Sequence, residues 1–500
     1  MGRVDTLLQL LFCFLLAFLV LMICSANSFL YEFNDWVDLN WYITMGRGIA
    51  SGKVMYKDLF DHKGPLLYLV FAFLALFPNP YIAVWLLEVV CFTLFLFLSY
   101  KIANRYLNKT ISLVAVILIA AIVPTSTAFV VGGGAVEEFC LPILMYFLLV
   151  FLEITEDDVC LTKKRSLLIG TLLSVLFWVK FTLIVIPGIV MLVWLIKSLI
   201  KRRFKNVLQN LLMMLAGFVL VTIPIMIYFL ANRAFSDLYN VYFYDNLFTY
   251  NGKPNLQFNF KWLVWSKVKY EIILLLIGFG FMTLRKNYLY TILLVSSLFY
   301  HIYMASHVYY NLPLLMFSFV GVVMLLQFVN VNFHALFKAE ILIMALTICG
   351  VVVGTKNNTA IELNIPKESY VQYQVAEKIK TYDMENPTLF CYRMMDYGFY
   401  NAAGLIPQEK FYALSNFSYE AFPEMYEAQN RAVRECHADF VVLWSVDYDE
   451  TNDIFSGYEF VDEYTYQLHE DSNHWTFNFT LLKKVWYKQN KNVDKFIFSS

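Results

Sequence analysis

Long uninterrupted apolar runs dominate this 500-residue chain and exclude an ordinary water-soluble fold. A helix needs about 20 apolar residues to cross roughly 30 Å of hydrocarbon. Hydrophobic residues make up 59% of the chain and charged residues only 15%, whereas about a quarter of a soluble domain is charged. The run lengths predict an α-helical polytopic membrane protein with about eleven transmembrane helices, at residues 7–24, 81–100, 111–131, 139–152, 166–180, 183–200, 208–230, 270–284, 288–304, 309–329 and 341–354.

The loop charges predict the orientation of these helices. The apolar segment 65–77 is shorter than a span, so we expect it to be re-entrant or interfacial. With that segment outside the hydrocarbon, the basic loops 101–109, 163–165, 201–203 and 285–286 fall on one side, and the acidic loops 35–61 and 137–138 on the other. Cytoplasmic loops collect Lys and Arg. We therefore predict a multi-pass protein of the cell membrane with a cytoplasmic N-terminus and an extracellular C-terminal domain.

The composition becomes mixed polar and apolar from residue 355, and no later run could span a bilayer. We expect a transmembrane domain at 1–354 with a first external loop at 28–64, then a soluble extracytoplasmic α/β domain at 355–500. Strands are expected at 388–392, 410–414, 439–443 and 475–482, and helices at 370–382 and 420–436. Cys391 and Cys436 share this domain, and a disulfide between them is one alternative.

The first external loop concentrates carboxylates, cations and aromatic residues in the stretch that begins Asn34-Asp35-Trp36-Val37-Asp38. Asp35 and Asp38 are three residues apart, so both carboxylates share a face if this segment is helical. Ionisable groups at a membrane boundary are costly and usually pair with one another or serve a site. Ordinary solvated loop charges are the alternative to a functional site.

The order of these motifs resembles the GT-C superfamily of membrane glycosyltransferases. Within it, the likeness is to the protein mannosyltransferase and aminoarabinose transferase group (glycosyltransferase family 39-type), whose first external loop carries Asp-Glu-x-x-Tyr followed by Lys-Pro-Pro-Leu. Asp38 and Tyr42 match the first motif, and Lys63 with Pro65 and Leu66 matches the second.

Two positions depart from that pattern, because Leu39 replaces the second acid and Gly64 replaces the first proline. The chain also looks similar, along nearly its whole length, to membrane proteins of Gram-positive bacteria. That likeness rests on the Asn-Asp-Trp-Val-Asp start, a Lys-Asp-Leu-Phe-x-x-Lys-Gly-Pro-Leu-Leu stretch, and the Asp-Tyr-Gly-Phe-Tyr run that begins at Asp396.

The resemblance implies transfer of a sugar from a polyprenyl-phosphate donor to a cell-envelope glycan or teichoic acid acceptor on the outer face. In such a reaction a carboxylate takes the acceptor proton and cations hold the departing phosphate. We expect Asp38 to be the base, Lys63 to contact the phosphate, and Asp35 and Tyr42 to bind substrate. A divalent metal is an open alternative, with His62 as its candidate ligand, because related transferases have an acid there.

Further candidate substrate-binding residues lie between or at the ends of spans. They are Glu137 and Glu138 after a triple glycine, Lys180 between two spans, and His307 and Tyr310 at the start of another. A lysine as deep as Lys180 needs a partner or a phosphate, whereas a charged helix start or an interfacial aromatic residue is the plain alternative for the others.

Two other functions use the same features. A transporter or flippase of lipid-linked glycans would need charged or broken helices near mid-bilayer and repeat symmetry, and no repeat is visible in the sequence. A non-catalytic scaffold of polysaccharide assembly would explain the missing acid at Leu39. Lys and Arg number 38 and Asp and Glu 39, a balance that gives no sign of nucleic-acid binding.

Overall fold

The computed structural model describes residues 3–126, 128–129, 133–249, 269–304, 307–332, 338–356, 363, 365–468 and 475–485. The chain separates into two compact units. The first unit comprises Met1–Tyr31, Tyr81–Ile227 and Lys253–Leu363, and the second comprises Glu32–Pro80, Tyr228–Gly252 and Asn364–Ser500. The first external loop, expected at 28–64 with the membrane helices, therefore falls largely in the second unit, because its side chains pack with the C-terminal domain.

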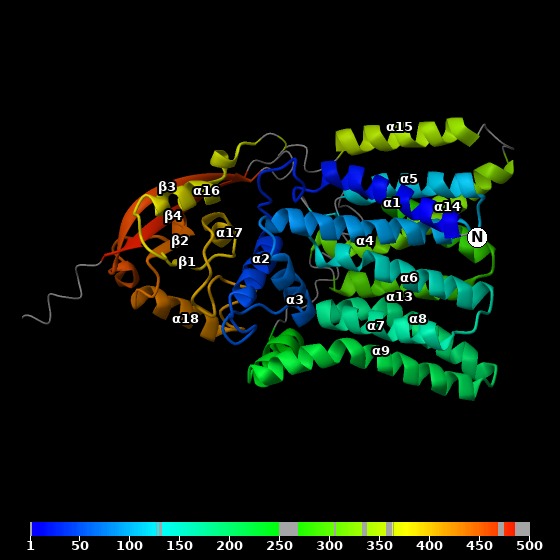
Figure 1. The fold of residues 1–500 in the computed structure, drawn as a ribbon, viewed down its shortest axis with the longest axis horizontal. Coiled ribbons are helices and arrows are strands. Elements are labelled where there is room, and N and C mark those ends of the chain that lie inside the picture. The colour runs from blue at the N-terminus through cyan, green and yellow to red at the C-terminus, as the bar shows by residue number, and fades with distance from the viewer. Residues whose placement is uncertain are drawn as a thin grey trace, which may run out of the picture. The chain divides into compact units, whose positions relative to one another are not determined.

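The first unit is a bundle of helices that run alongside one another (Figure 1). Its elements are α1 (Arg3–Cys24), α4 (Pro80–Ala103), α5 (Lys109–Thr125), α6 (Val136–Glu156), α7 (Lys163–Lys180), η1 (Phe181–Ile184), α8 (Val185–Ile200), most of α9 (Phe204–Ala231), α12 (Lys269–Leu284), α13 (Tyr288–Met304), η3 (Val308–Leu314), α14 (Leu315–Asn332) and α15 (Lys338–Lys356). Each of the expected spans coincides with one of these helices.

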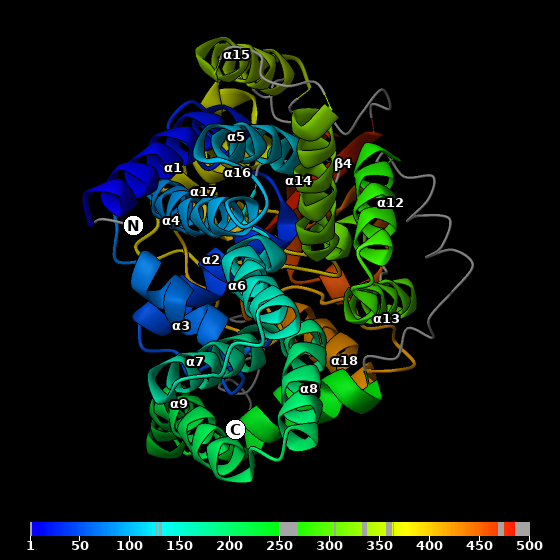
Figure 2. The ribbon, with the colours of Figure 1, turned by 90° about the vertical axis from the view of Figure 1, so that its right-hand side faces the viewer.

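Among the described residues, six helical stretches are long and apolar enough to cross a membrane, and one of them, Lys163–Ile200, contains α7 and α8. The remaining bundle helices are shorter apolar helices. Only 17% of the apolar window in Phe204–Ala231 (α9) is buried, against 67% in Val136–Glu156 (α6). The helix α9 accordingly lies at the edge of the bundle and α6 near its middle when viewed end-on (Figure 2). The protein is thus a multi-pass membrane protein.

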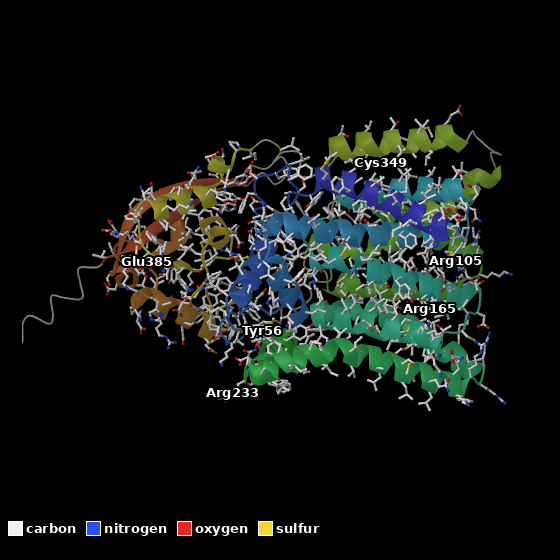
Figure 3. The ribbon with its side chains drawn as sticks, viewed as in Figure 1. Tyr56, Arg105, Arg165, Arg233, Cys349 and Glu385 are labelled. Atoms are coloured by element: carbon white, nitrogen blue, oxygen red, sulfur yellow. The ribbon has the colours of Figure 1, made fainter. Side chains whose placement is uncertain are left out.

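The basic loops of the first unit gather at one end of its helices. Arg105 and Arg165 lie at that end in Figure 3, where Arg105 forms ion pairs with Glu156 at 3.1 Å and Asp157 at 2.8 Å. Lys201 pairs with Asp158 there. This clustering is what the charge pattern predicts; which side of the membrane the end faces stays a prediction.

The second unit joins the first external loop to the C-terminal domain. It contains α2 (Val37–Ala50), α3 (Pro65–Leu74), α10 (Phe235–Asp237), η2 (Leu238–Thr249), η4 (Lys367–Ser369), α16 (Val371–Lys380), β1 (Leu389–Cys391), α17 (Phe399–Ala403), α18 (Pro423–Arg434), β2 (Phe440–Trp444), η5 (Ser445–Asp447), η6 (Asp453–Phe455), β3 (Tyr458–Leu468) and β4 (Trp475–Lys484). The segment expected at 65–77 is the ten-residue α3, too short to span a bilayer.

The four strands form one sheet in the order β1-β2-β4-β3. The strands β1 and β2 are parallel, and the other two pairs are antiparallel. The core strand β2 is almost fully buried, and buried apolar residues of α18 pack with it. The expected α/β domain is therefore present, and its mixed sheet gives the second unit a rigid base.

Two details of this domain differ from expectation, and the structure decides one alternative that the sequence left open. Residues 410–414 form no ladder; they run beside β1 through single bonds such as the one from Cys391 N to Tyr412 O at 3.3 Å. The strand β3 was not predicted, because its alternating charged and aromatic residues resemble a surface segment until β4 pairs with it. Cys391 and Cys436 are both free thiols rather than a disulfide.

Candidate functional site

A small polar pocket in the second unit brings Asp38 and Lys63 together. Lys63 Nζ lies 3.9 Å from Asp38 Oδ2, and the two side chains remain 12% and 14% exposed. Tyr42, one helical turn after Asp38 on α2, donates its hydroxyl to the same oxygen at 3.2 Å. The pocket is also lined by Trp41, Asp61, His62, Met395, Ser415 and Asn416. Three of its lining residues therefore come from the C-terminal domain.

The loop that carries Lys63 is held by hydrogen bonds that other side chains donate to its backbone carbonyl groups. Tyr56 donates its hydroxyl to the Lys63 carbonyl, and Asn246 Nδ2 donates to the His62 carbonyl at 2.7 Å. Gly64 is the N-cap of α3 and Pro65 opens that helix, where a proline loses no intrahelical hydrogen bond. The Lys-Gly-Pro sequence thus places Lys63 directly before the N-cap of α3.

Asp61 gives the pocket a buried charge, and His62 lies directly beside it. Burial raises the pKa of the Asp61 carboxyl, but hydrogen bonds from His62 and Tyr68 and the charge of Lys63 outweigh it, so the pKa lies below 3.8. Burial and the neighbouring Lys63 lower the pKa of His62 below 6.5. Asp61 is therefore an anion and His62 neutral at physiological pH.

The tautomer of His62 follows from its neighbours. Its Nδ1 lies 3.3 Å from Asp61 Oδ1 and 3.4 Å from Ser415 Oγ. A tautomer that donates from Nδ1 to the carboxylate carries its lone pair on Nε2. Asp61, Ser415 and Nδ1 all meet at the same ring nitrogen, so this trio lacks the geometry of a Ser-His-Asp hydrolase, in which the two partners use different nitrogens.

Asp35 lies apart from Asp38. The helix α2 begins at Val37, so the condition that would place both carboxylates on one helix face is not met. Asn34 instead turns the chain by accepting a hydrogen bond from Trp36 N at 3.0 Å, and Asp35 accepts one from the Tyr466 hydroxyl on β3. Asp35 is not among the residues that line the pocket.

A second cluster, in the first unit, contains the other predicted cations and aromatics. Lys180 forms an ion pair with Glu137, and its Nζ lies 3.7 Å from the centroid of the Tyr310 ring. His307 contacts Tyr310 edge-on, with ring centroids 5.5 Å apart. Lys180 has extended backbone between α7 and η1, and this break in the helix directs it to the first turn of α6. The cluster lies at the opposite end of α6 from Glu156.

Glu138 has a different environment from its neighbour Glu137. One Glu138 oxygen accepts a hydrogen bond from Gly134 N at 3.0 Å, and the other has no hydrogen-bond partner among the described residues. Glu88 is fully buried close by and accepts bonds from Ser25 at 2.6 Å and Asn27 at 2.8 Å. Glu138 therefore lies near Glu88 and not near Lys180. The adjacent residues Glu137 and Glu138 of α6 thus belong to two separate clusters.

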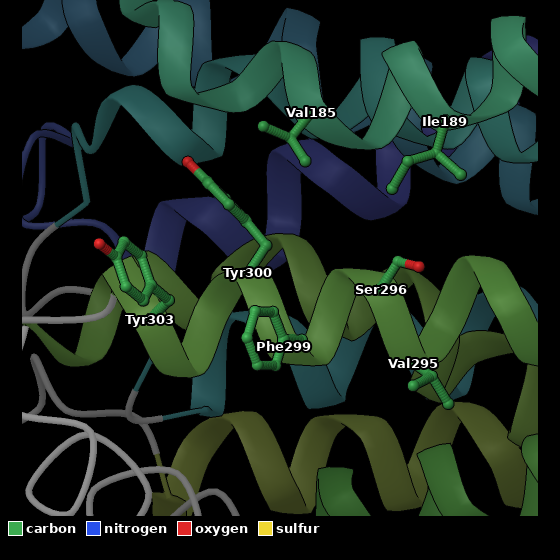
Figure 4. A pocket seen from close by; sticks show the side chains of 7 residues that line it. All are labelled: Val185, Ile189, Val295, Ser296, Phe299, Tyr300 and Tyr303. Atoms are coloured by element: carbon green, nitrogen blue, oxygen red, sulfur yellow. The ribbon is translucent and has the colours of Figure 1, made fainter.

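An apolar pocket of about 470 Å³ opens between α8 and α13 in the first unit (Figure 4). It is lined by Val185, Ile189, Val295, Ser296, Phe299, Tyr300 and Tyr303. Tyr300 donates its hydroxyl to the Thr182 carbonyl at 2.7 Å, two residues from Lys180. Tyr300 therefore links the lining of this pocket to the chain segment that follows Lys180.

The described residues do not form a complete metal site. No three His, Cys, Asp or Glu side chains converge within the part of the chain that the structure describes. His62 lies beside Asp61, whose oxygens accept hydrogen bonds from the His62 backbone at 2.7 Å and from Tyr68. A divalent metal at His62 stays a prediction that these residues alone do not support.

Sequence analysis missed part of the polar pocket. Asp61 was not chosen, although it stands directly before His62 and Lys63, which is a usable signal. Ser415, Asn416 and Met395 lie more than 330 residues further along the chain, and no local pattern indicates that they approach the first external loop.

The bundle and the C-terminal sheet domain together define the GT-C fold. The crystal structure of ArnT from Cupriavidus metallidurans in the apo state matches with a TM-score of 0.56 over 95% of this chain and 97% of that one, at 10% identity. The structure of the same protein bound to undecaprenyl phosphate matches with a TM-score of 0.55 over 96% and 98%, again at 10% identity. At this identity the likeness concerns the fold.

The sequence profile of the family described as dolichyl-phosphate-mannose-protein mannosyltransferase matches residues 62–233. This stretch begins at the polar pocket and includes Lys63, Glu137 and Lys180. No curated protein matches the sequence. The profile covers only part of the chain, and the likeness to the solved structures concerns the fold.

Proposed function

We propose that this protein transfers a sugar from a polyprenyl-phosphate donor to a cell-envelope glycan or teichoic acid on the outer face of the membrane. The observation that carries the proposal is the pocket in which Asp38 lies 3.9 Å from Lys63 while both remain partly exposed. An inverting transfer needs a carboxylate to accept a proton and a cation to stabilise the leaving phosphate, and this pocket contains both kinds of group. The likeness to Gram-positive membrane proteins motivates the choice of acceptor.

In the proposed reaction the acceptor hydroxyl oxygen attacks the anomeric carbon and its proton passes to Asp38. The bond between that carbon and the phosphate oxygen breaks, and polyprenyl phosphate leaves with its electron pair. Tyr42 keeps the Asp38 carboxylate oriented through its 3.2 Å hydrogen bond. Lys63 stabilises negative charge that develops on the leaving phosphate.

The Lys180 cluster and the apolar pocket support the choice of donor. Lys180 and Tyr310 offer a cation and a hydroxyl to a phosphate, and the pocket beside Tyr300 offers an apolar surface to a prenyl chain. ArnT from Cupriavidus metallidurans, which shares the fold, binds undecaprenyl phosphate. We infer that the same ligand class binds to this protein, with Lys180 and the surface between α8 and α13 as candidate contacts in the first unit.

A flippase of lipid-linked glycans is the second candidate function. The buried acids Glu88 and Glu138 favour it, because ionisable groups inside a helical bundle often line a transport path. A non-catalytic scaffold of polysaccharide assembly is the third. Neither function has an evident need for the pairing of Asp38 with Lys63.

The test compares three strains that carry no copy of the gene, the wild type, or Asp38→Asn. Envelope glycans and polyprenyl-phosphate sugars are measured in each. We expect the null strain and the variant to lose one sugar substituent and to accumulate one lipid-linked sugar. An unchanged envelope in the null strain, or wild-type behaviour of Asp38→Asn, would exclude the proposed catalytic role.

The predicted orientation has its own test. Cys160 is exposed at the basic end of the first unit, and Val446 in the C-terminal domain is 93% exposed. A membrane-impermeant maleimide should label Val446→Cys on intact cells and leave Cys160 unmodified until the membrane is opened. The reverse pattern would invert the predicted topology and move the reaction to the cytoplasmic face.

A further inference from the structure

A short segment of the C-terminal domain, residues 396–401, holds one face of α2. Asp396 accepts a hydrogen bond from Thr44 Oγ1 at 2.6 Å. Asn401 Nδ2 donates to the backbone and side-chain oxygens of Asn40 at 3.1 and 3.0 Å, and Arg47 donates to the Tyr400 carbonyl at 3.3 Å. Residues 40, 44 and 47 recur at helical spacing, so they form one stripe of α2. We call residues 396–401 the anchor segment.

The anchor segment is built for close approach to α2. Gly398 has a φ of +94°, and a Cβ at that position would lie 2.8 Å from Asn40 Oδ1 and 2.6 Å from the Phe33 ring. The left-handed backbone also lets Gly398 N donate to Asp396 Oδ1 at 2.9 Å. Asp396, Asn40 and Thr44 are each at most 1% exposed. Only glycine fits at this position. The backbone of the anchor segment therefore packs directly against the Asn40 side chain of α2.

The opposite side of α2 carries the candidate base. At about 100° per residue, Asp38 and Tyr42 lie roughly across the helix from Asn40 and Thr44. Met395, the residue before the anchor segment, lines the polar pocket that contains Asp38. A shift of α2 on its anchored face would therefore move the carboxylate relative to Lys63, which is fixed independently through Tyr56.

We propose that the anchor segment positions Asp38, through the hydrogen bonds from Thr44 to Asp396 and from Asn401 to Asn40, so that the C-terminal domain is an integral part of the transfer site. This inference rests on the proposed function. It assigns Asp396, Asn401 and Thr44 as positioning residues, and it makes the C-terminal domain more than a separate module for binding polymer.

The experiment measures turnover and donor KM of the full-length protein in detergent or proteoliposomes. Thr44→Val removes the hydroxyl and keeps the side-chain shape, and it should lower turnover about tenfold while leaving donor KM within about twofold, because a small displacement of a reacting group is costly. Thr44→Ser should restore turnover. Asp396→Asn should retain most of it, since its amide can donate to Thr44 while its oxygen still accepts from Gly398 N.

Thr388→Val is the matched control. The Thr388 hydroxyl donates to Asp439 at 2.7 Å within the C-terminal domain, so its loss weakens the domain through a comparable bond away from α2. Asn401→Ala is a second test variant in case Thr44→Val does not fold. Combining Thr44→Val with Asp396→Ala should be no more harmful than the worse single change, because both remove one bond.

The possible outcomes separate the two proposals. If the wild type is active, Asp38→Asn is inactive, and Thr44→Val and Asn401→Ala behave like Thr388→Val, the positioning role is overturned while the proposed function stands. If turnover falls only in the variants of the anchor contacts and Thr44→Ser recovers it, the positioning role is supported. If the wild type itself transfers no sugar, the proposed function fails and the positioning role fails with it.

Discussion

Each unit of the molecule holds one carboxylate–lysine pair made of predicted site residues, and the two pairs differ in geometry. In the second unit, Asp38 and Lys63 are 3.9 Å apart and 14% and 12% exposed. In the first unit, Glu137 and Lys180 are in direct contact, Glu137 is 2% exposed, and Tyr310 covers the ammonium group. The Asp38–Lys63 pair is called loose, because its charged atoms are 3.9 Å apart beside a polar pocket. The Glu137–Lys180 pair is called closed, because its charged atoms are in direct contact beneath Tyr310.

This difference suggests different work for the two pairs. A group that exchanges protons with substrate must be able to leave its partner, and the loose Asp38–Lys63 pair permits that. A charge at the end of a membrane helix needs continuous neutralisation, because removing one partner of a buried pair is strongly destabilising. In the closed pair, Glu137 supplies this neutralisation to Lys180.

The largest effect is expected from the loose pair. Asp38→Asn keeps the shape of the side chain and its bond with Tyr42, but it cannot accept a proton, so the transfer rate should fall about 10²- to 10⁴-fold. Protein abundance and thermal midpoint should stay near those of the wild type. Transfer assays on purified protein, with donor binding measured in parallel, check this. Loss of folded protein would instead identify Asp38 as a structural carboxylate.

Breaking the closed pair should act mainly on stability. Lys180→Met leaves Glu137 buried without its cation and should cost about 3–5 kcal/mol of unfolding free energy. Adding Glu137→Gln to Lys180→Met should recover most of the stability but not the donor affinity. Thermal unfolding and donor KM of both variants distinguish the two effects. A double variant with wild-type donor KM would remove Lys180 from the donor site.

The anchor carboxylate gives the second unit a dependence on pH. Burial raises the pKa of Asp396 from 3.8 to about 6. The stability that the protonated Asp396 carboxyl adds to the folded state is therefore fully present below pH 3.8 and is lost as the pH rises to about 6. At about 1.4 kcal/mol per pKa unit, the free energy of unfolding changes by roughly 3 kcal/mol.

Asp396→Asn should remove this dependence and raise the thermal midpoint at pH 7 relative to the wild type. Melting curves at pH 4, 5, 6 and 7 measure the change. An equal slope in the wild type and Asp396→Asn would show that Asp396 is not the titrating group.

The smallest effect is expected from the aromatic cover of the closed pair. Tyr310→Leu removes a cation–π contact with a centroid distance of 3.7 Å, which is worth about 0.5–2 kcal/mol, and should raise donor KM several-fold. Tyr310→Phe keeps the ring and should change KM less. Equal KM values for the two variants would mean that the hydroxyl, and not the ring, matters at this position.

Local properties of the sequence predicted the bundle. Each expected span corresponds to a helix, because hydrocarbon imposes a minimum run length that can be read without knowing any neighbour. The helices at 370–382 and 420–436 were expected from another local property, because α16 and α18 each carry their own apolar stripe. The strand β3 was not, because its identity depends on pairing with β4.

The sequence by itself determined that this chain crosses a membrane many times, carries a C-terminal α/β domain, and concentrates charge in its first external loop. Only the tertiary structure decided which charges meet. The bond from Thr44 to Asp396 joins residues 352 positions apart, and the pair of Lys180 with Glu137 joins residues 43 apart. Run length and periodicity are properties of a segment, whereas such contacts arise from the packing of whole elements, which no local pattern encodes.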